Sequence, residues 1–253
     1  MAANKFFSPA EQHRMIGTLA AQPVAADVTP TDIRVPDTFY TRYGKRMLDI
    51  VVALIALVLT LPLNLLLAAA TYLDVGGPIL FRQQRVGRNG RFFTIVKFRN
   101  MTNDTDEHGR LLPAAQRITR WGSFVRKTSL DELLNFISIL KGDMSLIGPR
   151  PLLPEYTERY HRRHKMRLML RPGLECPPCK PLAHAWTWQE QLDNDVWYVQ
   201  NVSFLLDCKM LLCLVRFAVD GKHAQMRSDV ARGAFMGYSA TGEAIGEFEM
   251  DRR

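Results

Sequence analysis

Residues 50–73 read IVVALIALVLTLPLNLLLAAATYL, and this stretch contains no Asp, Glu, Lys, Arg or His. At about 1.5 Å per residue, a helix of this length can cross a bilayer. Pro62 and Asn64 stand in its middle, where a proline removes one helical hydrogen bond and clashes with the preceding turn. Backbone groups freed at bilayer depth need new partners. We therefore expect a re-entrant helix-break-helix over residues 45–73, broken at Pro62, that enters one leaflet and returns.

Two other interpretations of this apolar run stay open. A kinked transmembrane helix is possible, because membrane-spanning helices tolerate proline. A cleaved signal peptide has only Ala68-Ala69-Ala70 in its favour, since the run is longer than a usual signal-peptide core and begins near residue 50. Basic residues flank the run on both sides, which predicts that both flanks lie on the cytoplasmic face: Arg42, Lys45, Arg46, Arg82, Arg85 and Arg88.

The formal charge of +8 suits anionic headgroups, nucleotides or nucleic acid. No nucleic-acid recognition motif accompanies this charge, so we expect no nucleic-acid partner. A hydrophobic content of 47% over 253 residues is enough for one core of ordinary size. We expect a weakly ordered N-terminal extension over 1–44, the membrane helix over 45–73, one catalytic domain over 74–222, and a C-terminal tail over 223–253.

The patterns within the catalytic domain predict an α+β fold. Residues 79–81 and 92–96 are typical of a short hairpin about Gly87 and Gly90. Residues 154–171 are expected to form a strongly basic helix lying against anionic lipid. Residues 197–219 are expected to form a second amphipathic helix, either at the membrane interface or packed in the core.

Residues 126–151, RKTSLDELLNFISILKGDMSLIGPRP, place the acid pair Asp131 and Glu132 between Arg126 and Arg150. Adjacent carboxylates can supply a nucleophile or magnesium ligand together with a base, and fixed guanidiniums can take up charge developing on a phosphoryl group. An ordinary alternative is that Thr128 or Ser129 caps a helix that begins near Leu130, with the acids in its first turn. The prolines on both sides of Arg150 stiffen its backbone for phosphate binding.

The chain resembles the bacterial monotopic phosphoglycosyl transferases, which are polyprenyl-phosphate sugar-1-phosphate transferases. The resemblance runs from about Lys45 to about Val219. It rests on the order and spacing of several motifs: Lys45-Arg46-x-x-Asp49, residues 81–90 (FRQQRVGRNG), residues 97–101 (KFRNM), residues 126–151, Arg171-Pro-Gly173 and residues 195–198 (DVWY). In this family a proline at the place of Pro62 breaks the re-entrant helix, although Leu61 stands here where the family usually has serine.

The resemblance implies a reaction and its partners. Asp131 is the expected nucleophile toward a UDP-sugar, Glu132 the base or positioning group, and Mg²⁺ the cofactor that Asp131 helps to bind. Arg126, Arg150, Lys45 and Arg46 are the expected phosphate and substrate contacts. UMP leaves, and a polyprenyl phosphate such as undecaprenyl phosphate accepts the sugar phosphate at the cytoplasmic face of the bacterial inner membrane. Membrane lipids and later glycosyltransferases are the other expected partners, in exopolysaccharide, capsule, O-antigen or glycoprotein glycan assembly.

One segment departs from the family pattern. After Arg171-Pro-Gly173 the family continues Thr-Gly-(Trp/Leu)-Ala-Gln-Val-x-Gly-Arg, and the stretch from Leu174 to Ala183 lacks this arginine, with Lys180 as a candidate substitute. Cys176 and Cys179 in this segment could be reduced thiols, a redox pair or part of a zinc site. The departure keeps two other functions open: a membrane-bound scaffold with weakened catalysis, and a phosphohydrolase that passes the intermediate to water.

Overall fold

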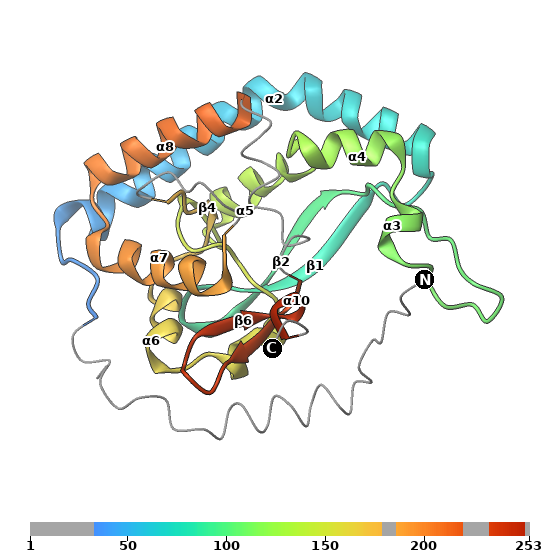
Figure 1. The fold of residues 1–253 in the computed structure, drawn as a ribbon. Coiled ribbons are helices and arrows are strands. Elements are labelled where there is room, and N and C mark those ends of the chain that lie inside the picture. The colour runs from blue at the N-terminus through green and yellow to red at the C-terminus, as the bar shows by residue number, and fades with distance from the viewer. Residues whose placement is uncertain (1–32, 179–185, 220–232, 251–253) are drawn as a thin grey trace.

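In the part of the chain that the structure describes, one long helix, α2, covers a mixed domain of short helices and three two-stranded sheets (Figure 1). The computed structural model describes residues 33–178, 186–219 and 233–250. Its α-helices are α2 (Lys45–Val75), α3 (Ala114–Arg117), α4 (Arg120–Lys127), α5 (Asn135–Lys141), α6 (Arg162–Lys165), α7 (Trp188–Asn201), α8 (Phe204–Val219) and α10 (Glu247–Met250). Its strands are β1 (Leu80–Val86), β2 (Phe92–Phe98), β3 (Ser145–Ile147), β4 (Gly173–Glu175), β5 (Phe235–Tyr238) and β6 (Ala244–Gly246). This composition confirms the α+β prediction.

Helix α2 runs without interruption through Pro62, so the predicted division into two helices is wrong. The helix instead changes direction along its length (Figure 1). Polar side chains bond within the affected turns: the Thr60 hydroxyl donates to the carbonyl of Ala56 (2.7 Å), and the Asn64 amide donates to the Thr60 hydroxyl (3.2 Å). A proline therefore bends this helix, because it removes one hydrogen bond while its neighbours keep theirs.

The N-terminal end of α2 is fixed to the domain by buried charges. Asp49 accepts hydrogen bonds from the Ser145 hydroxyl (2.9 Å) and the Leu146 amide (3.0 Å) at β3. The Lys45 ammonium pairs with Asp207 of α8 (2.6 Å). These contacts hold α2 and α8 next to each other, as Figure 1 shows.

The C-terminal end of α2 is fixed to the same domain. Arg99, just after β2, donates to the carbonyls of Val75 and Gly76. Asp74 accepts a hydrogen bond from the Thr119 hydroxyl (2.6 Å) at the start of α4. Both ends of the apolar helix are thus bound to one folded body.

The outer face of α2 is apolar and open. In the stretch Tyr40–Val75, which is long and apolar enough to cross a membrane, only 17% of the most apolar window is buried. Several aliphatic side chains along it are each more than half exposed: Leu54, Val58, Leu59, Leu65, Leu66 and Leu73. Exposed apolar area on this scale marks a surface that contacts lipid or protein.

The predicted hairpin is confirmed and is longer than expected. Strands β1 and β2 pair antiparallel from Leu80 opposite Phe98 to Val86 opposite Phe92. Asn89 and Gly90 adopt positive φ at the turn, which glycine and asparagine tolerate best. Lys97, Arg99 and Asn100 lie at the end of β2 and just after it, at the end of the hairpin opposite the turn.

Strands β3 and β4 form a parallel pair that requires two glycines. A Cβ at Gly173 would lie 2.1 Å from the amide nitrogen of Gly148, and a Cβ at Gly148 would lie 2.5 Å from the carbonyl oxygen of Arg171. No side chain fits at either position. The loop that follows Gly148 carries Arg150.

The predicted basic helix over residues 154–171 is wrong. The segment consists of the 3₁₀ turn Pro154–Arg159, helix α6 and the 3₁₀ turn Met166–Met169. His164 and Arg167 within it are buried, with 0% and 2% of their surface exposed, so this side of the segment packs inside the domain and not against lipid. The break lies at Tyr160 and His161, whose backbones are extended, and the apolar and basic spacing of the segment does not indicate it.

The predicted single helix over residues 197–219 is also wrong, since α7 ends at Asn201 and α8 begins at Phe204. Thr187 and Glu190 form a capping box that starts α7. The described part of the C-terminal tail is not loose, because Phe235 of β5 is fully buried against Tyr156 and Trp188. Part of the N-terminal extension is ordered too: the Tyr40 hydroxyl donates to Asp207.

Candidate active site

The acid pair lies on a tight turn between α4 and α5. Helix α4 ends at Lys127, Ser129 adopts a left-handed conformation (φ 56°), and a single 3₁₀ turn spans Leu130–Glu132. The ordinary alternative is right in part, because a helical turn begins at Leu130 with both acids in it. Neither Thr128 nor Ser129 makes a side-chain capping bond to this turn, so the expected cap is absent. Side chains of adjacent residues on a 3₁₀ turn point about 120° apart. Asp131 consequently faces inward while Glu132 stays partly exposed.

Asp131 is a buried carboxylate with one fixed partner. Only 3% of its surface is exposed, and the side-chain amide of Asn100 donates to its Oδ2 atom over 3.0 Å. Burial raises the pKa of Asp131 to about 6, and the charge of Glu132 adds to this effect, while Lys97 and Arg126 oppose it. Near neutral pH the group is thus a poorly solvated carboxylate, which favours reaction with an electrophile.

Lys97 supplies a cation beside both acids. Burial lowers the pKa of its ammonium group, and the charges of Asp131 and Glu132 act in the opposite direction. The ammonium also lies 5.6 Å from the centre of the Phe81 ring. The sequence did not place Lys97 beside the acid pair, because nothing local indicates that β2 packs against the acid turn.

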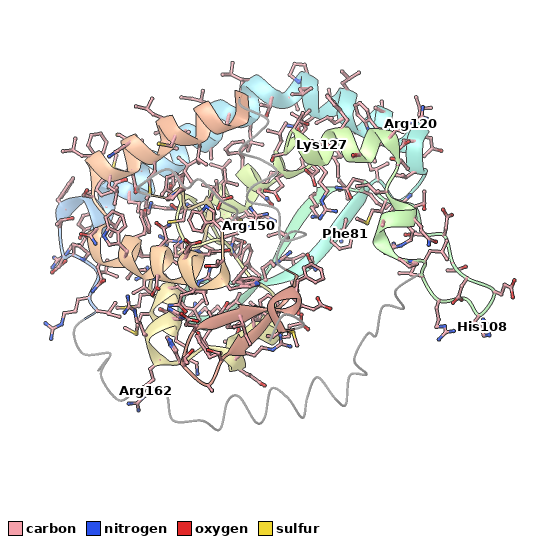
Figure 2. The ribbon with its side chains drawn as sticks, in the orientation of Figure 1. Phe81, His108, Arg120, Lys127, Arg150 and Arg162 are labelled. Carbon is pink, nitrogen blue, oxygen red and sulfur yellow. The ribbon has the colours of Figure 1, made fainter. Side chains whose placement is uncertain are left out.

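Arg150 bridges two carboxylates. Its Nη2 atom lies 3.2 Å from Oε1 of Glu132, and its Nη1 atom lies 3.4 Å from Oε2 of Glu175. All three side chains are partly exposed. Figure 2 shows Arg150 in the middle of the molecule, in the same region as Phe81 and away from the peripheral His108 and Arg162. The structure therefore brings Arg150 to the acid pair, as the sequence suggested, and adds Glu175, which sequence analysis did not assign.

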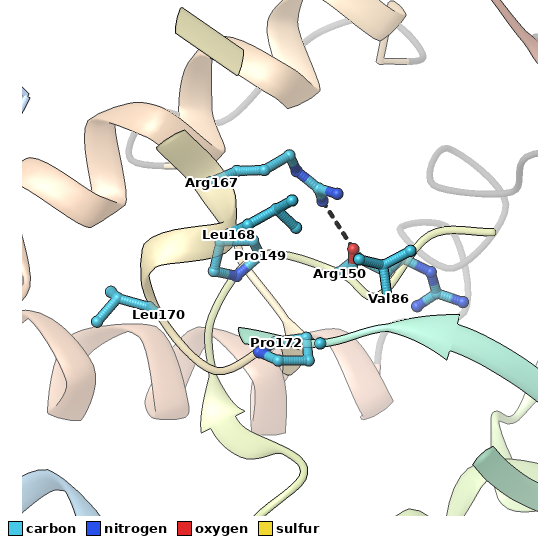
Figure 3. Close-up of a pocket in the computed structure, with 8 residues that line it drawn as sticks. Val86, Pro149, Arg150, Arg167, Leu168, Leu170 and Pro172 are labelled. Carbon is cyan, nitrogen blue, oxygen red and sulfur yellow. Dashed lines mark hydrogen bonds between the residues drawn. The ribbon is translucent and has the colours of Figure 1, made fainter. Parts of the chain in front are cut away.

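The side chain of Arg167 holds the backbone of Arg150. A narrow cleft runs behind the residue, and Figure 3 shows the Arg167 side chain reaching across it to the Arg150 carbonyl. Nη2 of Arg167 donates to that oxygen over 2.7 Å. The cleft is lined by Val86, Gly87, Pro149, Arg150, Arg167, Leu168, Leu170 and Pro172.

Arg126 stands on the last turn of α4 with an exposed side chain. Its positive charge lowers the pKa of Asp131, so it lies within electrostatic reach of the acid. Within the residues that the structure describes, its guanidinium has no hydrogen-bond or ion-pair partner in the protein. An exposed cation beside an acid pair can bind an incoming anion.

Comparison with known proteins agrees with this arrangement. A family model described as bacterial sugar transferase matches residues 40–221. The chain belongs to the bacterial sugar transferase family. It is therefore an enzyme of the transferase class, and the resemblance inferred from its motifs is confirmed.

Three relatives illustrate the range of the family. The sugar transferase EpsL of Bacillus subtilis is 40% identical over 197 residues, which cover 76% of this chain and 96% of the relative. The UDP-N-acetylgalactosamine-undecaprenyl-phosphate N-acetylgalactosaminephosphotransferase of Aeromonas hydrophila is 34% identical, covering 74% of this chain and 46% of the relative. The undecaprenyl-phosphate galactose phosphotransferase of Salmonella typhimurium is 36% identical, covering 68% and 39%. This sugar transferase thus matches nearly the whole of EpsL but less than half of the two larger enzymes.

Lys45 and Arg46 occupy structural positions in this sugar transferase. The Lys45 ammonium donates to Asp207 (2.6 Å), to the Ile147 carbonyl (2.9 Å) and to the Tyr198 hydroxyl (2.9 Å). Arg46 donates to the carbonyls at the end of α5, those of Ile139 (2.6 Å) and Leu140 (2.9 Å). Their donors join α2 to the domain, so we leave both residues out of the phosphate-binding site proposed below.

The donor set around Asp131 limits how the sugar transferase could bind magnesium. Among residues 33–178, 186–219 and 233–250, no cluster of three or more His, Cys, Asp or Glu side chains could hold a metal ion. Mg²⁺ often binds proteins through one or two carboxylates and completes its shell with substrate phosphates and water. Asp131 fits that mode as a single protein ligand.

The cysteine segment is only partly described. Cys176 is buried, and the Asn194 side-chain amide donates to its sulfur (3.4 Å) and to its carbonyl (3.1 Å). Cys179, Lys180 and Ala183 lie outside the described residues. The zinc, redox and arginine-replacement hypotheses for this segment therefore stay predictions.

Proposed function

We propose that this sugar transferase moves a sugar 1-phosphate from a UDP-sugar to a polyprenyl phosphate such as undecaprenyl phosphate. The observation that carries the proposal is the buried carboxylate of Asp131, placed next to Glu132 within reach of Lys97 and Arg126. The relatives from Aeromonas hydrophila and Salmonella typhimurium are named for reactions of this type.

The proposed reaction has two displacements at one phosphorus. A carboxylate oxygen of Asp131 attacks the phosphorus nearest the sugar, the bond to the UMP oxygen breaks, and UMP leaves. A phosphate oxygen of the polyprenyl phosphate then attacks the sugar-phosphoryl aspartate, and the Asp131 carboxylate is released. The product is a polyprenyl diphosphate sugar, which can start exopolysaccharide, capsule, O-antigen or glycoprotein glycan assembly.

The surrounding charges suit both steps. Arg126 has an exposed guanidinium that can bind donor phosphate, and Lys97 lies close enough to compensate charge as the acid and the phosphates approach each other. Glu132 pairs with Arg150 over 3.2 Å, which favours a positioning role over that of a base. Mg²⁺ bound to Asp131 and the donor phosphates would neutralise negative charge at the reacting phosphorus.

Protein contacts at both ends of α2 support a re-entrant membrane helix. A straight helix of 31 residues is about 46 Å long, so crossing the bilayer would place its ends on opposite sides. Asp49 and Asp74 instead contact β3 and the start of α4 in one domain. We infer that α2 enters and leaves one leaflet with its bend near Pro62 toward the lipid, and that the domain lies on the cytoplasmic face of the inner membrane, where UDP-sugars are made.

The test is release of UMP from a panel of UDP-sugars by the protein in nanodiscs, with Mg²⁺ and undecaprenyl phosphate. Asp131→Asn is the inactive variant, and Glu107→Gln, on an exposed loop, is the matched carboxylate-to-amide control. Multiple turnovers of UMP release that require the lipid and vanish only in Asp131→Asn support the transferase. Silence of folded wild-type protein across the panel favours the scaffold, and free sugar phosphate formed without the lipid favours the phosphohydrolase.

A further inference from the structure

A buried ion pair lies directly behind Arg150. Nε and Nη2 of Arg167 donate to Oδ2 of Asp195 over 2.9 and 2.7 Å. Their side chains are 2% and 1% exposed. Burying two charges costs solvation free energy, and a pair of this kind often adds little net stability compared with apolar residues. The pair therefore calls for a role other than stabilising the fold.

Arg167 has further donors, and one of them holds the loop that carries Arg150. Nη2 also donates to the Arg150 carbonyl over 2.7 Å, and Nη1 donates to the Tyr160 hydroxyl over 3.2 Å. The guanidinium has several N–H donors in a rigid plane, so fixing it on Asp195 also fixes the direction of its bond to Arg150. The Arg150 carbonyl is partly buried, and a hydrogen bond from a charged donor holds it more strongly than a neutral one would.

The backbone of this loop is restrained on both sides of Arg150. Pro149 and Pro151 each have φ fixed by their rings. The Pro149 carbonyl accepts a hydrogen bond from the Gly173 amide (3.1 Å), and the Pro151 carbonyl accepts one from Arg85 (3.3 Å). Between these two bonded carbonyls, Arg167 adds a charged hydrogen bond to the carbonyl of Arg150 itself.

We propose that Arg167 and Asp195 are positioning residues that hold Arg150 at the acid pair. Neither needs to touch substrate, because the effect passes through the Arg150 backbone to a guanidinium 3.2 Å from Glu132. This inference rests on the proposed function for its kinetic consequence. Its structural part, that Arg167 fixes residues 148–152, can be tested without any substrate.

The kinetic test is a double-mutant cycle on UMP release in nanodiscs. Arg167→Lys keeps the charge but not the planar donors, and we expect it to lower kcat/KM about 10- to 100-fold, as expected for loss of a charged hydrogen bond. In an Arg150→Gln background the same change should have less than about a threefold effect, because its target is already gone. The matched control is Arg163→Lys in the same segment, whose ion pair with Asp193 is about 40% exposed. It should stay within about twofold of wild type.

Hydrogen exchange supplies the readout that is independent of activity. The amides of Gly148, Arg150 and Leu152 should exchange faster in Arg167→Lys than in wild type or Arg163→Lys, while the amides of β5 and β6 stay unchanged. If Arg167→Lys fails to fold, the double variant Arg167→Met with Asp195→Leu removes both charges together and should fold, yet it should show the same faster exchange.

The outcomes separate this inference from the proposed function. Faster exchange together with a non-additive cycle supports both. Faster exchange in a protein whose wild type releases no UMP leaves the positioning intact and contradicts the proposed function. Unchanged exchange at residues 148–152, or additive losses in the cycle, overturns the positioning role and leaves Arg167 and Asp195 as a structural pair.

Discussion

The side-chain amide of Asn100 donates to the carboxylate of Asp131 over 3.0 Å, and this contact joins the end of the β1–β2 hairpin to the acid turn. Asn100 also lies against α4, because a Cβ at Gly122 would come within 2.0 Å of its carbonyl oxygen. The hairpin, α4 and the acid turn are therefore mutually fixed at the reacting carboxylate.

The close approach of Gly122 to Asn100 predicts that Gly122→Ala lowers the unfolding free energy. Alanine is better than glycine inside a helix by about 1 kcal/mol, so Gly122→Ala would stabilise α4 if the helix were free. Because a methyl group would overlap the Asn100 carbonyl, we expect a loss of about 2 kcal/mol or more in unfolding free energy and lower activity. Thermal unfolding and UMP release test this, with Ser123→Ala on the same helix as the near-neutral control. A more stable Gly122→Ala protein would show that the packing is not rigid.

The first half-reaction should depend on the ionisation of Asp131. Its pKa is raised to about 6, so the ionised fraction of Asp131 grows as the pH rises through this value. The rate of the UMP burst, measured without acceptor lipid, should therefore rise with pH through about 6 and then level off. Glu132→Gln removes a charge that raises this pKa and should move the rising limb to lower pH. Asn100→Ala removes a donor to the ionised form and should move it to higher pH. A burst that stays constant from pH 5 to 8 would contradict the assignment of Asp131 as the ionised nucleophile.

The same pKa shift makes Asp131 costly to the fold at neutral pH. Its folded pKa of about 6 lies above the ordinary value of 3.8, so its favourable contribution is complete below pH 3.8 and is lost as the pH rises through 6. Asp131→Asn should thus be more stable than wild type at pH 7 to 8, by up to about 3 kcal/mol, and the difference should disappear near pH 4. Unfolding of both proteins over this pH range measures it. Equal stabilities at pH 8, with Glu107→Gln also unchanged, would contradict the burial effect.

The re-entrant arrangement predicts that both flanks of α2 are accessible from one side of the membrane. Single cysteines at Thr38 and Glu107, in protein whose native cysteines are replaced by serine, should both react with a membrane-impermeant maleimide in inverted inner-membrane vesicles. Neither should react in right-side-out spheroplasts. Labelling of the two sites from opposite sides would establish a transmembrane helix instead.

Sequence alone predicts the parts of this molecule whose signals are local. The apolar composition of residues 50–73 indicates a membrane helix, and Gly87 and Gly90 predict the β1–β2 hairpin. The proximity of Arg150 to the acid pair could also be predicted, because these residues lie in one short motif.

The remaining features depend on partners that are distant in the chain. Arg167 looks like one more surface cation until Asp195, 28 residues later, packs against it. Lys97 alternates with apolar residues as any edge-strand lysine would, and its place at the site follows from how β2 meets the acid turn. Lys45 was expected at phosphate, yet the buried carboxylate of Asp207 on α8 holds it.

The most direct test of the account is the mass of the protein after reaction with its UDP-sugar and Mg²⁺ in the absence of polyprenyl phosphate. The account predicts about one equivalent of released UMP and a sugar-phosphate adduct on the peptide that contains Asp131. Added undecaprenyl phosphate should remove the adduct, and Asp131→Asn should never form it. UMP release that occurs only with the lipid, with no adduct at any time, would show direct transfer between the two substrates and would contradict the role of Asp131 as nucleophile.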